Sequence, residues 1–167
     1  MQRFSATMDS VAKTISFAII IVILIPFYTI GRIYVQIHDA RLFIIPIVVV
    51  LALFLAYLYR PQGYGLDQTN LHIFRSIKPI MIPLKNIRSI MPITSKEMGF
   101  GLSAFVVGGF FGYFGKYVFK KQGAAWMYVT DQSKMLLIIL ADESQVVISP
   151  DDTEGFMKAF HEIMRRN

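Results

Sequence analysis

Two long uncharged segments constrain this chain more than any other feature of its sequence. Residues 14–31 and 42–59 each contain 18 residues without a charged side chain, and basic residues flank both segments. An 18-residue helix is about 27 Å long, which approaches the ~30 Å thickness of the hydrocarbon core of a bilayer. Neither segment has the polar stripe of a soluble amphipathic helix. We therefore expect two transmembrane helices with the lipid bilayer as their solvent.

The ten residues between the two segments are few enough to require antiparallel neighbouring helices. We expect an N-terminal tail at 1–13, a short extracytoplasmic loop at 32–41 and a folded domain at 60–167. The first segment could instead be a cleaved signal peptide, but no small-x-small cleavage site follows it. Both ends of the helical hairpin should therefore lie on one side of the membrane.

Positive charge is concentrated directly after the second hydrophobic segment. Residues 60–121 contain nine basic and two acidic residues, whereas residues 122–167 contain four basic and seven acidic residues. Basic residues favour the cytoplasmic side of a membrane. We therefore expect a multi-pass protein of the cell inner (cytoplasmic) membrane with both termini in the cytoplasm.

After the second hydrophobic segment the sequence changes to short apolar runs separated by turn residues. These runs predict seven strands. The strands cover residues 63–67, 70–75, 80–82, 87–93, 126–130, 135–140 and 145–148. Ser149, Pro150 and Asp152 predict the start of a C-terminal helix, with Ser149 as its N-cap. An apolar stripe on this helix, which includes Phe156, would cover the sheet.

Four local motifs resemble those of a known family. The motifs are YGLDQTNLHIFR, IPLKNIRSI, WMYVTDQSKMLLIIL and VVISPDDTEGFMKAF, and they extend over residues 63–165. They resemble the PH-like (pleckstrin-homology-like) domains of small bacterial membrane proteins with one or two preceding transmembrane helices. The resemblance implies an α+β membrane protein with a PH-like antiparallel β-barrel or sandwich of about seven strands, capped by a C-terminal α-helix. It also implies a binding or scaffolding role without enzymatic activity.

Residues 98–115 depart from a plain PH-like domain. This insertion contains no charged residue, six glycines and six aromatic residues. Its length would allow a third transmembrane span, with Gly108 and Gly112 on a close-packing face. Six glycines disfavour a helix, and a third span would divide one domain between the two sides of the membrane. We therefore expect an inter-strand insertion that enters the membrane interface or packs on the anchor helices. A buried element of the domain is the remaining alternative.

A group of basic and aromatic residues forms the candidate contact surface for the membrane. The basic side chains would meet anionic lipid headgroups beside an aromatic wedge from the insertion. The group consists of Lys78, Lys85, Arg88, Phe110, Phe111, Tyr113, Phe114, Lys116, Lys120 and Lys121. Alternatively, these charges only solubilise the surface and fix the topology.

No arrangement of residues favours catalysis, a metal or a cofactor. The chain has no cysteine, and its histidines (His38, His72 and His161) lack the spacing of a shared metal site. There is no Ser-His-Asp set and no phosphate-binding loop. We therefore expect a non-enzymatic binding or scaffolding module that engages a protein partner or its own copies, and no nucleic acid. The alternatives are an anionic-lipid sensor and an accessory subunit of a membrane complex or transporter.

Overall fold

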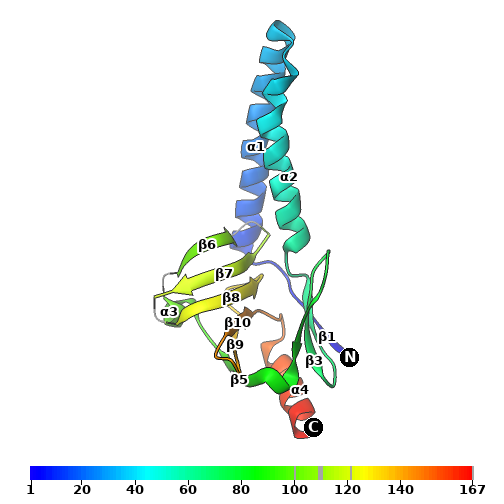
Figure 1. Ribbon diagram of the computed structural model, residues 1–167, viewed down its shortest axis with the longest axis vertical. Coiled ribbons are helices and arrows are strands. Elements are labelled where there is room, and N and C mark those ends of the chain that lie inside the picture. The colour runs from blue at the N-terminus through cyan, green and yellow to red at the C-terminus, as the bar shows by residue number, and fades with distance from the viewer. Residues whose placement is uncertain (100, 109–110, 121, 167) are drawn as a thin grey trace.

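Two long helices form a hairpin that stands on a β-rich domain (Figure 1). The computed structural model describes residues 1–99, 101–108, 111–120 and 122–166, and only the backbone of 101–108. The hairpin consists of α1 (Ser10–Ile37), the 3₁₀ turn η1 (Ala40–Phe43) and α2 (Ile44–Tyr59). Both arms are long and apolar enough to cross a membrane, and only 6% of each apolar window is buried within the protein. An exposed apolar surface of this extent is typical of a membrane protein.

α1 is longer than the uncharged segment that predicted it. Asp9 caps its N-terminus by accepting a hydrogen bond of 2.6 Å from the amide of Ala12. At the other end, His38 adopts a left-handed conformation with φ 56° and ends the helix. The helix therefore includes Lys13 and Arg32, whose long side chains can extend toward the polar interface. The connection that was expected at residues 32–41 is partly helical as a result.

A four-stranded antiparallel sheet contains both the segment that precedes the hairpin and the segment that follows it. Its strands, in spatial order, are β1 (Gln2–Ser5), β2 (Gly63–Leu66), β3 (Asn70–Phe74) and β4 (Ile80–Pro83). β1 precedes the hairpin and β2 follows it, with Phe4 opposite Tyr64. The two strands approach so closely that a Cβ added to Gly63 would lie 2.9 Å from the carbonyl oxygen of Phe4. The two ends of the hairpin therefore both lie at the domain, beside this sheet.

The second sheet has six strands in the order β5-β9-β10-β8-β7-β6. They are β5 (Ile87–Pro92), β6 (Gly101–Gly108), β7 (Tyr113–Phe119), β8 (Gly123–Val129), β9 (Leu136–Leu140) and β10 (Gln145–Ile148). All its pairs are antiparallel except β8 with β10, which is parallel. The helices of the domain are η2 (Leu84–Asn86), α3 (Ser95–Met98) and α4 (Thr153–Arg166). The predicted PH-like sandwich with a C-terminal helix is confirmed, and the described strands form two open sheets without a closed barrel.

The insertion forms strands in place of a third transmembrane helix. β6 pairs with β7, and β7 pairs with β8 with Tyr113 opposite Val129. The alternative of a third span at 98–115 is therefore wrong. Glycines disfavour a helix, whereas strand pairing satisfies the backbone groups of this segment within the domain.

Alternating side chains place one apolar cluster on each face of the second sheet. Leu136 and Ile138 belong to the cluster that the first sheet and α4 cover, together with Phe156. Leu137 belongs to the second cluster, which the segment after β5 covers with Met98. The sequence therefore supplies two cores from one set of strands.

α4 begins later than its sequence signals predicted. Asp152 is the residue that caps it, because its carboxylate accepts a hydrogen bond of 2.8 Å from the amide of Gly155. The predicted N-cap, Ser149, is completely buried and accepts a hydrogen bond of 2.8 Å from the amide of Thr130. The side chain of Ser149 therefore joins the ends of β8 and β10.

Candidate functional site

The foot of the hairpin is attached directly to the domain. The amide of Asp9 donates to the carbonyl oxygen of Thr130 at 3.0 Å. Both the amide and the hydroxyl of Thr7 donate to the carboxylate of Asp151, at 3.0 and 2.8 Å. These bonds hold the short segment between β1 and α1 against the domain. α1 therefore begins in a position that the domain determines.

The turn between β6 and β7 provides a second attachment, on the side of the helices. The amide of Phe111 donates to the hydroxyl of Ser16 at 2.9 Å, and this hydroxyl donates to the carbonyl oxygen of Ala12. Phe111 has a φ of 57°, and its ring makes a T-shaped contact of 5.0 Å with that of Tyr57 on α2. The expectation that the insertion packs on the anchor helices is confirmed at this residue.

Two arginines and three aromatic rings surround the foot of α2. The guanidinium carbon of Arg60 lies 4.4 Å from the ring centre of Tyr57 and 5.6 Å from that of Phe111. The guanidinium carbon of Arg75 lies 5.6 Å from the ring centre of Tyr59. A cation and the aromatic face beside it attract each other electrostatically. Tyrosines also favour the membrane interface. We call these five residues the aromatic–arginine collar.

Ser16 gives a direct test of the attachment between the hairpin and the domain. Ser16→Ala removes the hydroxyl that accepts from the partly buried amide of Phe111, so we expect this attachment to weaken by about 1–3 kcal/mol. Hydrogen exchange at the amide of Phe111 in the full chain should accelerate accordingly. The matched control is Thr14→Ala, because the Thr14 hydroxyl also bonds to a preceding helix carbonyl, that of Ser10. Equal exchange rates in the two variants would contradict the role of Ser16.

Apolar grooves lie along the hairpin between its two helices. One has a volume of about 360 Å³ and ends on the domain. It is lined by Ile20, Ile23, Leu24, Phe27, Val50, Leu53, Phe54, Tyr57 and Phe111. A second groove of about 500 Å³ lies nearer the hairpin turn, with Arg41 among its lining residues. Of these two grooves, only the first has a residue of the domain, Phe111, among its lining residues.

The predicted aromatic wedge lies mostly within the domain. Phe114 on β7 is buried with 8% of its surface exposed, so it does not extend toward the membrane. Tyr113 is half-buried and packs on the second core, where burial raises the pKa of its hydroxyl. Phe111 alone reaches the hairpin, and Phe110 lies outside the described residues. The wedge is therefore reduced to one described residue.

The predicted basic residues are distributed over the domain. Lys78 is exposed between β3 and β4, and its carbonyl oxygen accepts a hydrogen bond from Arg75 of the collar. Lys85 instead lines a groove with Met164, near the end of α4 that lies farthest from the hairpin (Figure 1). Arg88 is exposed at the beginning of β5, directly after η2. The structure therefore does not bring the predicted residues onto one surface.

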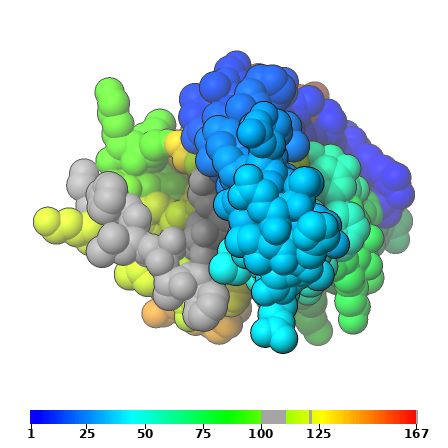
Figure 2. Space-filling model, turned by 90° about the horizontal axis from the view of Figure 1, so that it is seen from above, coloured from blue at the N-terminus to red at the C-terminus, as the bar shows by residue number. Residues whose placement is uncertain are grey.

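The remaining lysines lie on or beside β7. Lys116 is exposed opposite Trp126, and Lys120 is exposed directly after the strand. Lys121 lies outside the described residues. Seen along the hairpin, the domain extends past the helices on both sides, so part of its surface faces the same direction as the hairpin (Figure 2).

The collar could be found only in part from the sequence. Tyr57 and Tyr59 end a hydrophobic segment and Arg60 follows it, which is the usual pattern of an interfacial anchor. Nothing in the local sequence indicates that Phe111 and Arg75, far along the chain, complete it. Their contribution depends on how the turns of the domain meet the helices.

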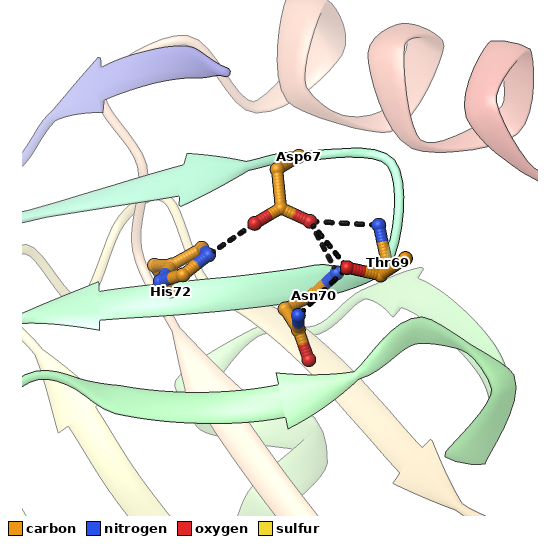
Figure 3. A network of polar contacts seen from close by, with 4 residues as sticks. All are labelled: Asp67, Thr69, Asn70 and His72. Carbon is orange, nitrogen blue, oxygen red and sulfur yellow. Dashed lines mark hydrogen bonds and ion pairs between the residues drawn. The ribbon is translucent and has the colours of Figure 1, made fainter.

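A separate polar network lies at the turn between β2 and β3 (Figure 3). One carboxylate oxygen of Asp67 accepts hydrogen bonds from the amides of Thr69 and Asn70 at 2.7 and 2.6 Å. The other lies 2.6 Å from Nε2 of His72. These contacts, first the bond with His72 and then the amide of Thr69, hold the pKa of Asp67 well below its usual range. Within the described residues, no three acidic or histidine side chains come together as a metal site.

This network should make the stability of the domain depend on pH. The pKa of Asp67 is lower in the folded chain, so its contribution is present above the unfolded value of about 3.9 and is lost as pH falls through the folded value. We therefore expect Asp67→Asn to be less stable than wild type at pH 7, with the difference shrinking below about pH 4. Melting temperatures from pH 7 to pH 3 measure this.

Asp142→Asn is the matched control for the contribution of His72 to this pH dependence. Asp142 also accepts hydrogen bonds from a residue two positions later, the amide and hydroxyl of Ser144, and its pKa is also lowered. It has no histidine among the causes of this shift. A pH-dependent difference as large as that of Asp67→Asn would show that His72 contributes nothing.

Comparison with family models identifies the class of the domain. Residues 62–163 match the family model described as the bacterial PH domain, a range that runs from β2 into α4. The chain belongs to this family. Comparison with curated proteins and with solved structures gave no match. The two apolar helices and β1 precede the matched range, so this chain combines the family domain with a hairpin anchor.

Proposed function

We propose that this protein is a non-enzymatic binding module that holds a PH-like domain at the cytoplasmic surface of the inner membrane, where it engages a protein partner or a second copy of itself. The observation that carries this proposal is the double attachment of the domain to the foot of the hairpin, through Asp9 and through Phe111. A domain attached at two points keeps a constant orientation. It therefore presents the same face away from the membrane.

The face turned away from the hairpin has the features of a contact surface. A groove of about 610 Å³ lies between the β2–β3 turn, η2 and α4. Its lining residues are Gln68, Thr69, Asn70, Pro83, Leu84, Lys85 and Met164. Met164 is 40% exposed, and methionines adapt readily to different partners. The mixture of polar and apolar groups suits a protein surface.

The cytoplasmic orientation is supported by charge. β1 and β2 belong to one sheet, so the N-terminus and the domain lie on the same side of the hairpin. The nine basic residues of 60–121 favour the cytoplasm for that side. A role as a lipid sensor through one continuous basic surface is less well supported, because the described basic residues are distributed over the domain.

Site-specific photocrosslinking of the full chain in intact cells tests the proposal. A photoreactive residue at position 85 lies in the far groove, and one at the exposed position 120 serves as the control. We expect a discrete product of higher mass from position 85 and none from position 120. A product of twice the mass of the chain would indicate a second copy. Absence of a product at position 85, together with a monomer in mild detergent, would contradict the proposal.

A further inference from the structure

We propose that the groove at the foot of the hairpin binds one anionic phospholipid, with an acyl chain between α1 and α2 and the phosphate on Arg60. This inference goes beyond the proposed function. It requires that the hairpin spans a bilayer, but it does not depend on any partner at the far face. Three features support it: the apolar walls of the groove, the contribution of Phe111 to its lower end, and Arg60 beside that end, which has no carboxylate partner among the described residues.

The walls and the length of the groove suit an acyl chain. The volume of about 360 Å³ lies within the range of about 300–1,000 Å³ that is usual for small-molecule sites. Ile20 and Phe27 on α1 mark its extent, and seven residues of helix span about 10 Å. This distance covers much of one leaflet of a ~30 Å hydrocarbon core. Phe111 of the domain lines the lower end, which distinguishes the site from a furrow formed by the two helices alone.

Arg60 provides the anionic specificity. Its guanidinium lies over Tyr57 and Phe111, both of which line the groove. Its Nε is buried and has no hydrogen-bond partner in the described part of the chain. The one ion pair within the same residues joins His72 and Asp67, so Arg60 has no carboxylate partner there. A buried donor without an acceptor is costly, and a phosphate matches the planar guanidinium.

Charge also favours a lipid over a second copy of the chain. Neither uncharged segment, 14–31 or 42–59, contains an acidic residue. A helix from another copy would therefore fill the apolar groove without offering an anion to Arg60 at the same depth. A phospholipid supplies both the apolar chain and the phosphate at the interface, where the first charged residue after α2 is expected to lie.

A tryptophan in the groove can measure which lipid occupies it. Trp126 is the only tryptophan of the chain and is 46% exposed, so Trp126→Phe removes the background signal at little cost. Tyr57→Trp then places a reporter in the groove and keeps an aromatic face for Arg60. The full chain is reconstituted into phosphatidylcholine vesicles with added phosphatidylglycerol, and either lipid carries bromine on its acyl chains. At equal mole fraction, we expect brominated phosphatidylglycerol to occupy the site about tenfold more tightly, as a charge-assisted hydrogen bond implies.

Variants of the arginines identify the group responsible. Arg60→Gln should abolish the preference, whereas Arg32→Gln, which removes the same charge near the hairpin turn, should retain it. Arg60→Lys keeps the charge but not the planar fork, and we expect an intermediate preference. Native mass spectrometry of wild type should show one retained phosphatidylglycerol that Arg60→Gln loses. This second measurement does not depend on the engineered tryptophan.

Three results would overturn the inference. Equal quenching by the two brominated lipids would indicate ordinary boundary lipid only. Quenching by neither lipid would indicate that protein covers the groove, as in a dimer through the hairpin. A preference that persists in both Arg60→Gln and Arg60→Lys would place the anion elsewhere. None of these results bears on the photocrosslinking at position 85, so the lipid site and the proposed function can fail independently.

Discussion

We expect Phe4→Ala to lower the free energy of unfolding of the domain by about 3–5 kcal/mol, the usual effect of truncating a buried aromatic side chain. Phe4 is 8% exposed, and its ring makes a T-shaped contact of 5.0 Å with that of Phe156 on α4. Truncation would leave a cavity between β1 and α4. The melting temperature of the full chain in detergent, followed by circular dichroism, should fall by more than about 10 °C.

The control for this substitution lies on the same strand. Gln2 is exposed, so Gln2→Ala should change the stability by no more than about 0.5 kcal/mol. If the two variants melted at the same temperature, β1 would not belong to the folded domain. A fragment that begins at residue 60 should likewise be less stable than the full chain, because it lacks β1 and uncovers Phe156.

A second large effect is expected from Tyr64→Phe. Tyr64 is completely buried, and its hydroxyl donates to the carbonyl oxygen of Tyr128 at 2.5 Å. The same hydroxyl accepts a hydrogen bond of 3.1 Å from the amide of Ser149. Removing it leaves both backbone groups buried without this partner, so we expect a loss of about 1–3 kcal/mol, measured as the fall in melting temperature. The hydroxyl therefore joins β2 of the first sheet to the second sheet.

Tyr117→Phe is the matched control, with the opposite expectation. The hydroxyl of Tyr117 is buried and has no hydrogen-bond partner among the described residues. Its removal should therefore be neutral or stabilising. A loss of stability as large as that of Tyr64→Phe would show that the bonds of Tyr64 are not the cause.

The hydroxyl of Tyr64 also gives the domain an alkaline limit. Burial raises the pKa of Tyr64 to about 12. The unfolded chain ionises this group near pH 10, so the contribution is present below about pH 10 and is lost as pH rises through the folded value. As pH rises from about 10 to about 12, the free energy of unfolding of Tyr64→Phe should therefore fall less than that of wild type.

The sequence by itself determined the elements whose signal is local. Uncharged runs of 18 residues identify membrane helices because hydrocarbon excludes charge along the whole span. Seven strands and the C-terminal helix were likewise visible, because alternation and an apolar stripe depend on neighbouring residues only. The family resemblance rested on these same packing patterns, and the match over 62–163 confirmed it.

Only the tertiary structure decided where distant segments meet. β1 is four residues long, which is too short to show a periodicity of its own. It forms a strand because it pairs with the edge of β2. The insertion is as free of charge as segments 14–31 and 42–59, yet the pairing of β6 with β7 and of β7 with β8 makes it part of a sheet. The collar joins the end of α2 to Phe111 and Arg75 from separate turns. Such contacts depend on the placement of whole elements, and local sequence carries no record of that placement.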